Sequence, residues 1–308
     1  MEVVRDFERL HLLGEKFCLA IGVFDGVHLG HQRVIQTAME DARAAGATAA
    51  VLTFDPHPMR ALAPARAPLL LTSTPHKLEL LRQLGVEACL VIEFNREFAN
   101  TSAEAFVKMV ADRTPGLQTI CVGSRFRFGK DRRGDAALIR EIGAQRGFRL
   151  HELPSQTLGG ETISSTAVRK AVAAGDLEKA VQMLGRPFSI LGTVVPGDAL
   201  GRTIGFPTAN LNRHNEVLPS HGVYAARARI AGQLRPGLVN IGFRPTVKKA
   251  ASEPVTELHV LDFSGDLYDT DIEVFFIARL RDEKKFASLD ELRAQIQRDE
   301  QAARRLLA

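Results

Sequence analysis

The sequence predicts an α/β domain followed by an all-β domain, and three observations support this fold class. Up to about residue 185, short apolar runs alternate with helical patterns, which is typical of a parallel sheet with crossover helices. Beyond residues 185–187 the β-rich segments have no helical pattern between them, which indicates an antiparallel sheet or a small barrel. The length of 308 residues also favours two domains, because one domain usually holds about 100 to 200 residues. We therefore expect one domain over residues 1–185 and a second over residues 186–308.

Five short apolar runs mark the strands of the α/β domain. They cover residues 17–21, 49–54, 88–94, 119–122 and 148–153. Between them, Thr101 and Glu104 have the spacing of a capping box, and Asp135 precedes a helical pattern. Gly85 and Gly147 follow two other helical patterns, as glycines at helix ends commonly do.

A second set of runs marks the strands of the all-β domain. They cover residues 188–195, 222–230, 238–241, 256–263 and 271–280. One helix follows them, and Ser288 with Glu291 gives it a capping box. Its apolar stripe, which we expect to close the barrel, consists of Leu289, Leu292, Ile296, Ala303 and Leu307.

The composition narrows the class of protein. With 45% apolar and 25% charged residues, the chain is typical of a folded globular protein rather than a disordered one. Its net charge of +4 permits anionic ligands without requiring nucleic acid. Cys18, Cys89 and Cys121 lie in apolar runs without metal-ligand spacing, so we expect buried thiols. The N-terminus lacks the apolar core of a signal peptide, and no apolar run approaches the ~18 residues of a membrane span, so we expect a cytoplasmic protein.

Residues 22–31, with the sequence GVFDGVHLGH, are the most informative segment of the α/β half. They join the first predicted strand to a helical pattern over residues 32–45. Such a turn exposes free N–H groups at a helix N-terminus, where the helix dipole also favours an anion. We therefore expect a phosphate site in which His28 and His31 neutralise developing charge. The candidate nucleotide contacts here are Gly22, Phe24, Asp25, Gly26 and Gly30.

Other phosphate-binding motifs do not match this segment. The chain contains no GxxxxGKS or GxxxxGKT string, and the glycine spacing differs from the GxGxxG of dinucleotide folds. Either histidine alone is more typical of a solvated or packed turn residue. Together the ten residues resemble the signature of the HxGH nucleotidyltransferases, which attack the α-phosphate of ATP and expel pyrophosphate.

Two further segments follow predicted strands, where ligands of open parallel sheets gather. In residues 53–58, two prolines flank His57, which either reaches a phosphate or is solvated. Residues 123–135 begin at Gly123 and interleave basic side chains with Phe126 and Phe128. In one interpretation, these rings and guanidinium groups bind a flat base and its phosphates. In the other, the rings pack on the core and the guanidinium groups face solvent.

A third segment, residues 163–169, places three hydroxyl groups at a predicted helix N-terminus. Capping explains one of them. An arginine one turn inside the helix adds an oxyanion clamp that suits a leaving pyrophosphate. The residues concerned are Ser164, Ser165, Thr166 and Arg169.

These segments, in this order, resemble the N-terminal module of the prokaryotic bifunctional riboflavin kinase/FAD synthetases over residues 1–185. The resemblance implies a Rossmann-like nucleotidyltransferase domain with ATP over residues 22–31, His28 and His31 near its phosphates, and the third segment closing the other side. It also implies that FMN phosphate is the nucleophile, aided by Mg2+. Because that oxygen is already an anion, catalysis would rest on positioning and charge neutralisation.

The chain departs from this family at one place. After Gly123 the family usually carries acidic or amide residues, whereas this chain has Ser124 and Arg125. Arginine only donates hydrogen bonds. One alternative is therefore a riboflavin kinase whose adenylyltransferase half is weakened or idle.

A second glycine-rich system lies in the all-β half, in residues 192–197 and 201–211. Its segment GRTIGFPTAN places Thr208 and Asn210 on one side of an extended chain, where their oxygens suit Mg2+. Two neutral ligands bind weakly, so the metal is expected to arrive with the phosphates of ATP.

The segment TELHVLD supplies a candidate base. Its alternation puts Leu258 and Val260 on one face of a strand and Glu257 with His259 on the other. Glu257 is therefore either a solvent-facing acid or the acceptor of a proton from an attacking hydroxyl.

The glycine-rich system, residues 240–246, the TELH segment and residues 281–286 resemble the riboflavin kinase module. The resemblance covers the chain from about residue 186 onward and implies a six-stranded antiparallel barrel. In it Thr208 and Asn210 would bind Mg2+, and Glu257 would be the base as the ribityl 5′-hydroxyl attacks the γ-phosphate to give FMN and ADP. The implied flavin and ATP contacts are Gly192, Gly197, Gly201, Arg202, Gly205, Pro207, Asn240, Arg281, Glu283 and Phe286.

We therefore expect a two-domain enzyme that converts riboflavin to FMN and FMN to FAD. Its partners would be riboflavin, FMN and ATP, with no nucleic acid and no membrane, and the sequence leaves a homo-oligomer open. Besides the kinase with an idle second half, another alternative is a flavin- or RNA-binding regulatory protein that uses the basic residues 125–133 without turnover. Measuring FAD formation separates the two enzyme hypotheses, and an assay of ATP consumption with riboflavin separates both of them from the regulatory protein.

Overall fold

The chain divides into two compact units. The computed structural model describes residues 1–197, 201, 204–243 and 254–308. The first unit contains Met1–Leu69 and Thr74–Ser165, and the second contains Leu70–Ser73 and Thr166–Ala308. Among the helices of the described ranges, none combines the length and the hydropathy that crossing a bilayer requires.

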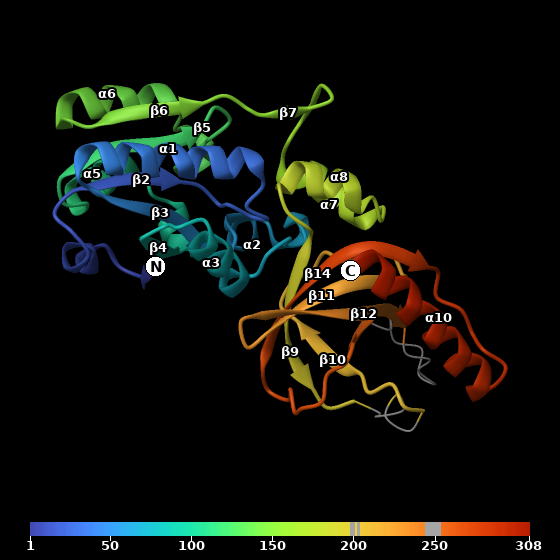
Figure 1. The fold of residues 1–308 in the computed structure, drawn as a ribbon. Helices are drawn as coiled ribbons and strands as arrows, with labels where there is room; N and C mark the ends of the chain where they lie inside the picture. The colour runs from blue at the N-terminus through green and yellow to red at the C-terminus, as the bar shows by residue number, and fades with distance from the viewer. Residues whose placement is uncertain (198–200, 202–203, 244–253) are drawn as a thin grey trace. The chain divides into compact units, whose positions relative to one another are not determined.

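The first unit is built on a parallel sheet of six strands (Figure 1). The strands are β1 (Glu2–Val4), β2 (Phe17–Ile21), β3 (Thr48–Asp55), β4 (Ala88–Glu93), β5 (Leu117–Gly123) and β6 (Arg149–Leu153). Their order is β1-β4-β3-β2-β5-β6, and every pairing is parallel. The five predicted strands are confirmed. The sixth, β1, was not predicted because three residues are too few to show a periodic pattern.

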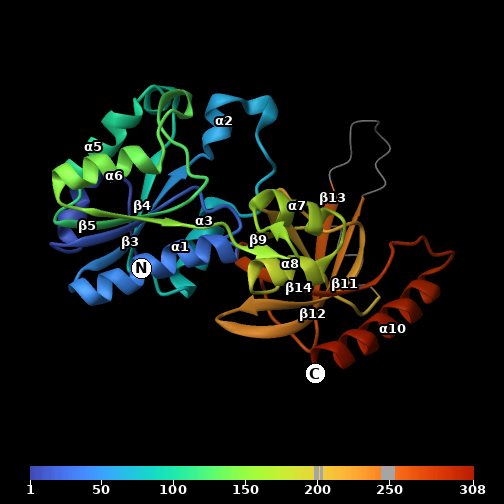
Figure 2. The ribbon, with the colours of Figure 1, turned by 90° about the horizontal axis from the view of Figure 1, so that it is seen from above.

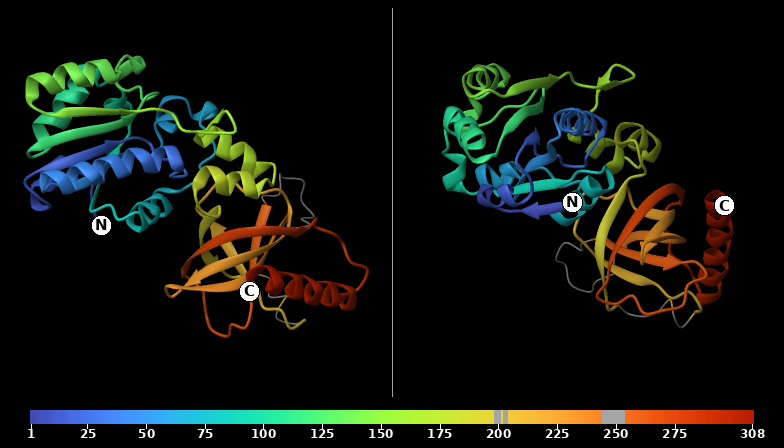
Figure 3. Two further views of the ribbon diagram at one scale, coloured as in Figure 1. Left: turned by 45° about the horizontal axis from the view of Figure 1, so that its top comes forward. Right: turned by 60° about the vertical axis from the view of Figure 1, so that its left-hand side comes forward.

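Helices cover both faces of this sheet (Figure 3). The helices of this unit are α1 (Leu29–Ala45), α2 (Pro58–Leu62), α3 (Thr74–Gln83), α4 (Arg96–Ala99), α5 (Ala103–Arg113) and α6 (Ala136–Arg146). Short 3-10 turns lie at Phe7–Leu12, Pro64–Arg66 and Lys130–Arg132, and a hairpin is formed by β7 (Thr157–Leu158) and β8 (Glu161–Thr162). Leu19 and Ile21 of β2 pack with side chains of α5 and α6, whereas Ala20 between them packs with α1 and α3. Because both faces are covered, the strands appear in the sequence as continuous apolar runs.

The capping box predicted at Thr101 and Glu104 is wrong by one residue. The N-cap of α5 is Ser102, whose Oγ accepts a hydrogen bond from the N–H of Ala105 at 3.1 Å. The Thr101 N–H instead donates to the carbonyl of Phe98, so Thr101 still belongs to the preceding turn. The Asp135 cap of α6 is confirmed.

The strand order of this sheet reverses at β2. From β2 the chain adds β3 and β4 on one side and later returns to add β5 on the other. Ligands of open α/β sheets bind at the carboxyl ends of the strands where the order reverses in this way. The segment after β2 and the segment after β5 therefore flank the expected ligand site of this unit.

The second unit is a closed antiparallel barrel accompanied by helices. Its strands, in the order β10-β13-β12-β11-β14-β9, confirm the predicted six-stranded barrel. They are β9 (Ser189–Val195), β10 (Ala209–Arg213), β11 (Gly222–Ile230), β12 (Gln233–Phe243), β13 (Pro254–Val260) and β14 (Asp271–Arg281). The helices are α7 (Ser165–Ala173), whose first residue belongs to the first unit, α8 (Leu177–Leu184) and α10 (Leu289–Leu307).

Helix α10 lies beside the barrel, as Figure 2 shows. Its predicted cap is confirmed, because Ser288 Oγ accepts a hydrogen bond from the N–H of Glu291 at 3.2 Å. Ala303 and Leu307 of the predicted stripe are buried against β11 and β12. Leu289 is 56% exposed, so its place in the buried stripe is wrong, because it lies in the first turn, away from that contact.

Candidate active sites

In the first unit, the turn after β2 leads directly into helix α1. His28 is the N-cap, and its Nδ1 accepts a hydrogen bond from the N–H of His31 at 3.3 Å. Since Nδ1 accepts, a neutral His28 ring carries its proton on Nε2. Because His28 is the cap, the helix begins at Leu29, three residues before the predicted start.

The two predicted catalytic histidines stack in the first turn of α1. Their ring centroids are 3.6 Å apart and their planes differ by 19°. Burial lowers the pKa of His31 well below its usual value, and the neighbouring His28 and Lys77 lower it further. Within the described residues, His31 Nδ1 is buried without a hydrogen-bond partner. An unsatisfied buried nitrogen at a helix N-terminus is expected where a polar ligand completes the site.

The backbone of this turn has an unusual conformation. Phe24 and Val27 have φ angles of +53° and +42°, a region that residues with a side chain rarely adopt. Gly26 has a φ of +80°, which glycine adopts without strain. A Cβ atom on Gly30 would lie 3.2 Å from the His28 ring, so glycine allows the ring to lie over the helix start. Strained backbone of this kind clusters at functional sites.

The hydroxyl-rich segment reaches the same turn. Ser165 Oγ donates a hydrogen bond to the backbone carbonyl of Asp25 at 2.9 Å, across 140 positions of sequence. The Asp25 side chain is buried. Ser164 directly precedes α7, while Thr166 and Arg169 lie within the part of α7 that belongs to the second unit. Their contact with ATP stays a prediction.

His57 and Gly123 mark the ends of the strands on either side of β2. His57 is the N-cap of α2, just after β3, and its Nδ1 accepts a hydrogen bond from the N–H of Met59 at 3.1 Å. Gly123 is the last residue of β5. The two residues that depart from the family follow it: Arg125 is exposed, and Ser124 Oγ lies 3.5 Å from Ser155 Oγ.

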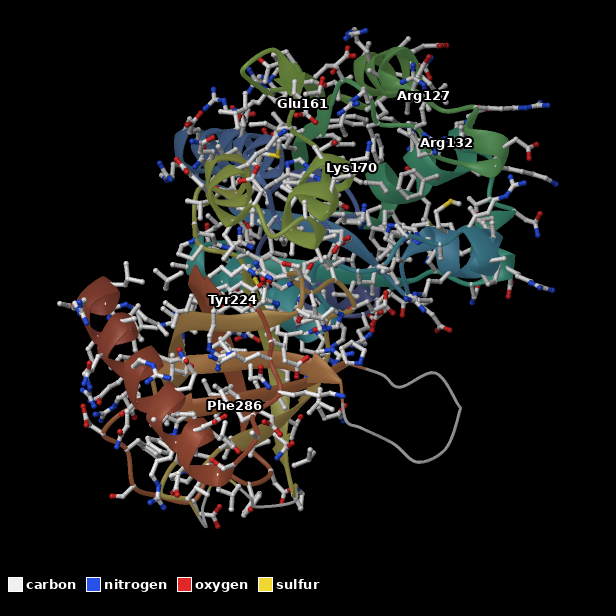
Figure 4. All side chains as sticks on the ribbon, turned by 90° about the vertical axis from the view of Figure 1, so that its right-hand side faces the viewer. Arg127, Arg132, Glu161, Lys170, Tyr224 and Phe286 are labelled. Carbon is white, nitrogen blue, oxygen red and sulfur yellow. The ribbon has the colours of Figure 1, made fainter. Side chains whose placement is uncertain are left out.

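The basic loop after β5 is divided between core and solvent. Phe128 is buried, with its ring 5.4 Å from that of Phe106, and Phe126 stacks on it at 5.3 Å. Arg127 and Arg132, labelled in Figure 4, are exposed. Phe128 therefore belongs to the core, which leaves Phe126 as the less buried ring.

Sequence reasoning missed Lys77 in the first unit. Its side chain is 5% exposed, and its Nζ donates three hydrogen bonds, one of them to the carbonyl of Val23 in the turn after β2. A signal was present in the sequence. Lys77 precedes Leu80 and Leu81 by three and four residues, so it lies on the buried face of its helix.

In the second unit, three predicted residues form one row across the barrel. Glu257 of β13 pairs with Asn210 of β10 on one side and with Asn240 of β12 on the other. Directly paired residues on antiparallel strands share a face. The structure therefore brings the candidate base and the candidate metal ligand Asn210 onto neighbouring positions.

This row lines a cavity of about 330 Å³. Its polar lining includes Thr208 and Glu283, and its apolar wall comes from the barrel and from α10. The residues are Gly201, Ile204, Phe206, Thr208, Asn210, Val223, Leu238, Asn240, Glu257, His259, Arg281, Glu283, Lys284, Phe286, Leu292, Ile296 and Asp299. An apolar wall with a few convergent polar groups is typical of a pocket for a small organic ligand.

Arg281 is held by an acid that the sequence analysis did not single out. Its Nε and Nη2 donate to the buried carboxylate of Asp299 on α10, at 2.8 to 3.1 Å. The guanidinium also lies 5.8 Å from the centre of the Phe286 ring, which is labelled in Figure 4. The pair of Arg281 and Asp299 thereby fixes one wall of the cavity.

The predicted glycines have different surroundings. A Cβ on Gly197 would overlap the Asn210 amide, and one on Gly201 would overlap the Phe206 carbonyl, so both allow close approach of the chain to the cavity. Gly205 has a φ of +88° and is exposed. Gly192 lies inside β9, outside the linings of the two cavities described here. Arg202 lies outside the described residues.

A second cavity, of about 570 Å³, adjoins the first. The two share Thr208 in their linings. The second is also lined by the segment between β13 and β14, including Phe263 and Tyr268. Thr208 therefore lies at the junction of two cavities.

His259 contacts the residue that directly precedes Thr208. The sequence analysis assigned it no role. Its Nδ1 lies 2.7 Å from the Pro207 carbonyl, and its Nε2 lies 3.0 Å from Glu300 Oε1. Its position two residues after Glu257 on the same strand face was the available signal.

Comparison with known proteins assigns both units. A family model for FAD synthetase matches residues 13–167, and one for riboflavin kinase matches residues 184–307. The bifunctional riboflavin kinase/FMN adenylyltransferase of Escherichia coli (strain K12) is 42% identical over 306 residues, covering 99% of this chain and 97% of that protein. The enzyme of the same description from Bacillus subtilis (strain 168) is 38% identical, covering 95% of this chain and 94% of that protein.

A solved structure shares the fold over nearly the whole length. It is a crystal structure of a protein from Streptococcus pneumoniae described as a macrolide-efflux protein, with a TM-score of 0.82, 28% identity and 99% coverage of both chains. The two family models support the bifunctional hypothesis over the kinase with an idle half and over the regulatory protein. Because the models match in this order and the relatives are similar over nearly their full length, the chain belongs to the family of bifunctional riboflavin kinase/FMN adenylyltransferases.

Proposed function

We propose that this chain phosphorylates riboflavin to FMN and then adenylylates FMN to FAD, using ATP in both steps. The observation that carries the proposal is that each family-matched region has its own candidate site: the histidine pair after β2 and the row of Asn210, Glu257 and Asn240 in the barrel. We place the boundary between the two catalytic domains at residues 185/186. The proposed location is the cytoplasm, in keeping with three free, buried cysteines.

In the kinase reaction, Glu257 is the proposed general base. It accepts the proton of the ribityl 5′-hydroxyl while that oxygen attacks the γ-phosphate of ATP and ADP leaves. We assign the cavity of about 330 Å³ to riboflavin because Glu257 and Phe286 line it. We assign the adjoining cavity of about 570 Å³ to ATP because it meets the first at Thr208, where phosphate transfer would occur.

The residues at this junction fit Mg2+. The hydroxyl of Thr208 and the amide oxygen of Asn210 are the hard oxygen ligands that this ion prefers, and both line the riboflavin cavity. Within the described residues no group of three or more His, Cys, Asp or Glu side chains could hold a metal. The remaining ligands are therefore expected from ATP and water. When bound, Mg2+ supplies charge stabilisation for the transferring phosphoryl group.

In the adenylyltransferase reaction, a phosphate oxygen of FMN attacks the α-phosphate of ATP, and pyrophosphate leaves. The N–H groups at the start of α1 bind the triphosphate, and His28 and His31 donate hydrogen bonds to it. Arg169 stabilises the leaving pyrophosphate. The proposed ATP contacts are Gly22, Phe24, Asp25, Gly26, Gly30, His57, Gly123, Ser164, Ser165 and Thr166.

One experiment tests both activities. The purified chain is incubated with riboflavin, ATP and Mg2+, and the flavins are separated by liquid chromatography. We expect FMN and then FAD. FMN without FAD would favour the kinase with an idle half, and unchanged riboflavin together with no FAD from supplied FMN would refute the proposal.

The metal assignment gives a separate prediction. We expect Asn210→Ala to raise the Mg2+ concentration needed for half-maximal FMN formation by roughly tenfold or more, because one oxygen ligand is lost. The matched control is Asn212→Ala, two residues further along β10, where the side chain is exposed. Equal Mg2+ dependence in the two variants would contradict the assignment.

A further inference from the structure

Lys77 is a buried cation below the turn that follows β2, and the proposed mechanism does not use it. It belongs to α3, and its side chain is 5% exposed. A buried lysine is costly unless its ammonium group is hydrogen-bonded, so such a residue calls for a physical explanation. Its partners supply one.

The three donors of the Lys77 ammonium group are all used. Nζ donates to Thr53 Oγ1 at 3.0 Å, to the Val23 carbonyl at 3.2 Å and to the Phe54 carbonyl at 3.3 Å. An ammonium group has three donors and no acceptor. In this geometry Lys77 has no hydrogen bond left for a substrate, which excludes a direct catalytic contact.

These bonds connect the ends of β2 and β3. Val23 follows β2, while Thr53 and Phe54 belong to β3. Thr53 Oγ1 also donates to the Val23 carbonyl, at 3.1 Å. The Val23 carbonyl thus has two donors, and it directly precedes Phe24, whose φ is +53°. A strained residue keeps its conformation only when its surroundings fix it. These two hydrogen bonds hold the peptide group on the N-terminal side of Phe24.

The charge of Lys77 also acts on the histidine pair. None of the ion pairs between described residues includes Lys77, although Asp25 and Asp55 act on it at longer range. Burial lowers the pKa of Lys77. Its positive charge in turn contributes to the lowered pKa of His31. A cation below the start of α1 also favours a bound anion.

We propose that Lys77 is a positioning residue for adenylyl transfer, whose buried ammonium group holds residues 22–27 in the conformation that presents the start of α1 and its two histidines to the triphosphate. This inference rests on the proposed adenylyltransferase activity. Lys77 acts through the Val23 carbonyl and through its charge, without touching the substrates.

The test compares variants of the full chain in both reactions. Lys77→Met removes the charge and the three donors, and misplacement of reacting groups costs roughly 100-fold in rate. We expect kcat for FAD formation from FMN and ATP to fall by about that factor. FMN formation from riboflavin, catalysed in the other unit, should be unchanged. The matched control is Lys108→Met on α5, a half-exposed lysine paired with Glu104, which should leave both reactions unchanged.

A second readout separates positioning from general destabilisation. In wild type the lowered pKa of His31 favours the neutral ring, which is the form we expect to donate to the triphosphate. Removing the Lys77 charge raises that pKa, so the acidic limb of kcat/KM for ATP should move to higher pH. Lys77→Arg keeps the charge and should keep the limb at its wild-type position.

If Lys77→Met does not fold, Thr53→Val decides the question. It keeps the charge and removes one donor to the Val23 carbonyl, so we expect a lower kcat with an unshifted acidic limb. A wild-type kcat for FAD formation in Lys77→Met, or in Thr53→Val where that variant decides, would overturn the inference. A wild-type chain that makes no FAD would overturn the proposed adenylyltransferase activity itself, which is a distinguishable result.

Discussion

Glu257→Gln is expected to lower the rate of FMN formation by about 100- to 10,000-fold while FAD formation from supplied FMN continues at the wild-type rate. Glutamine has nearly the same shape and can keep the row with Asn210 and Asn240. It cannot accept a proton from the ribityl hydroxyl. General base catalysis contributes about 100- to 10,000-fold, so a loss within that range is expected.

The measurement is chromatography of flavins after incubation with riboflavin and ATP, followed by a second incubation with FMN and ATP. The matched control is Glu178→Gln, an exposed glutamate on α8 in the same unit. Loss of both activities in Glu257→Gln would contradict separate sites. Retained kinase activity would show that Glu257 is not the base.

The elements that the sequence predicts well are those whose burial produces a strong pattern. The central strands β2 to β5 have both faces covered by helices, so their residues form continuous apolar runs that are visible without a structure. Strand β10 was not predicted as a strand because its sequence, ANLNR, alternates only weakly. It forms because β9 and β13 provide pairing partners on both sides, and those partners are distant in the sequence.

The two candidate sites also differ in how much of each could be predicted, because one is local in the sequence and the other depends on distant segments. The turn at residues 22–31 is local, so its glycines and histidines could be interpreted directly. The pairing of Glu257 with Asn210 and Asn240 depends on the register of three strands, and the sequence specifies only which face each side chain takes. The carboxylate that holds Arg281 belongs to Asp299 of α10. The sequence pattern of this helix does not specify where it packs on the barrel.

His28→Ala is expected to abolish FAD formation while FMN formation continues. Two effects contribute, because His28 is both a proposed phosphate ligand and the N-cap of α1. Loss of a helix N-cap costs roughly 1 kcal/mol of stability. The same measurement, chromatography of flavins from FMN and ATP, is therefore combined with thermal unfolding.

A second substitution separates these two effects of His28. Asparagine is a good N-cap, so His28→Asn can still accept the hydrogen bond from the N–H of His31 while it lacks the imidazole. We expect His28→Asn to unfold near the wild-type temperature and yet form no FAD. Ser102→Ala removes the cap of α5 in the same unit and should lower the unfolding temperature while FAD formation continues. If His28→Asn formed FAD at the wild-type rate, His28 would only start the helix, and the side-chain hydrogen bonds to the triphosphate would have to come from His31 and Arg169.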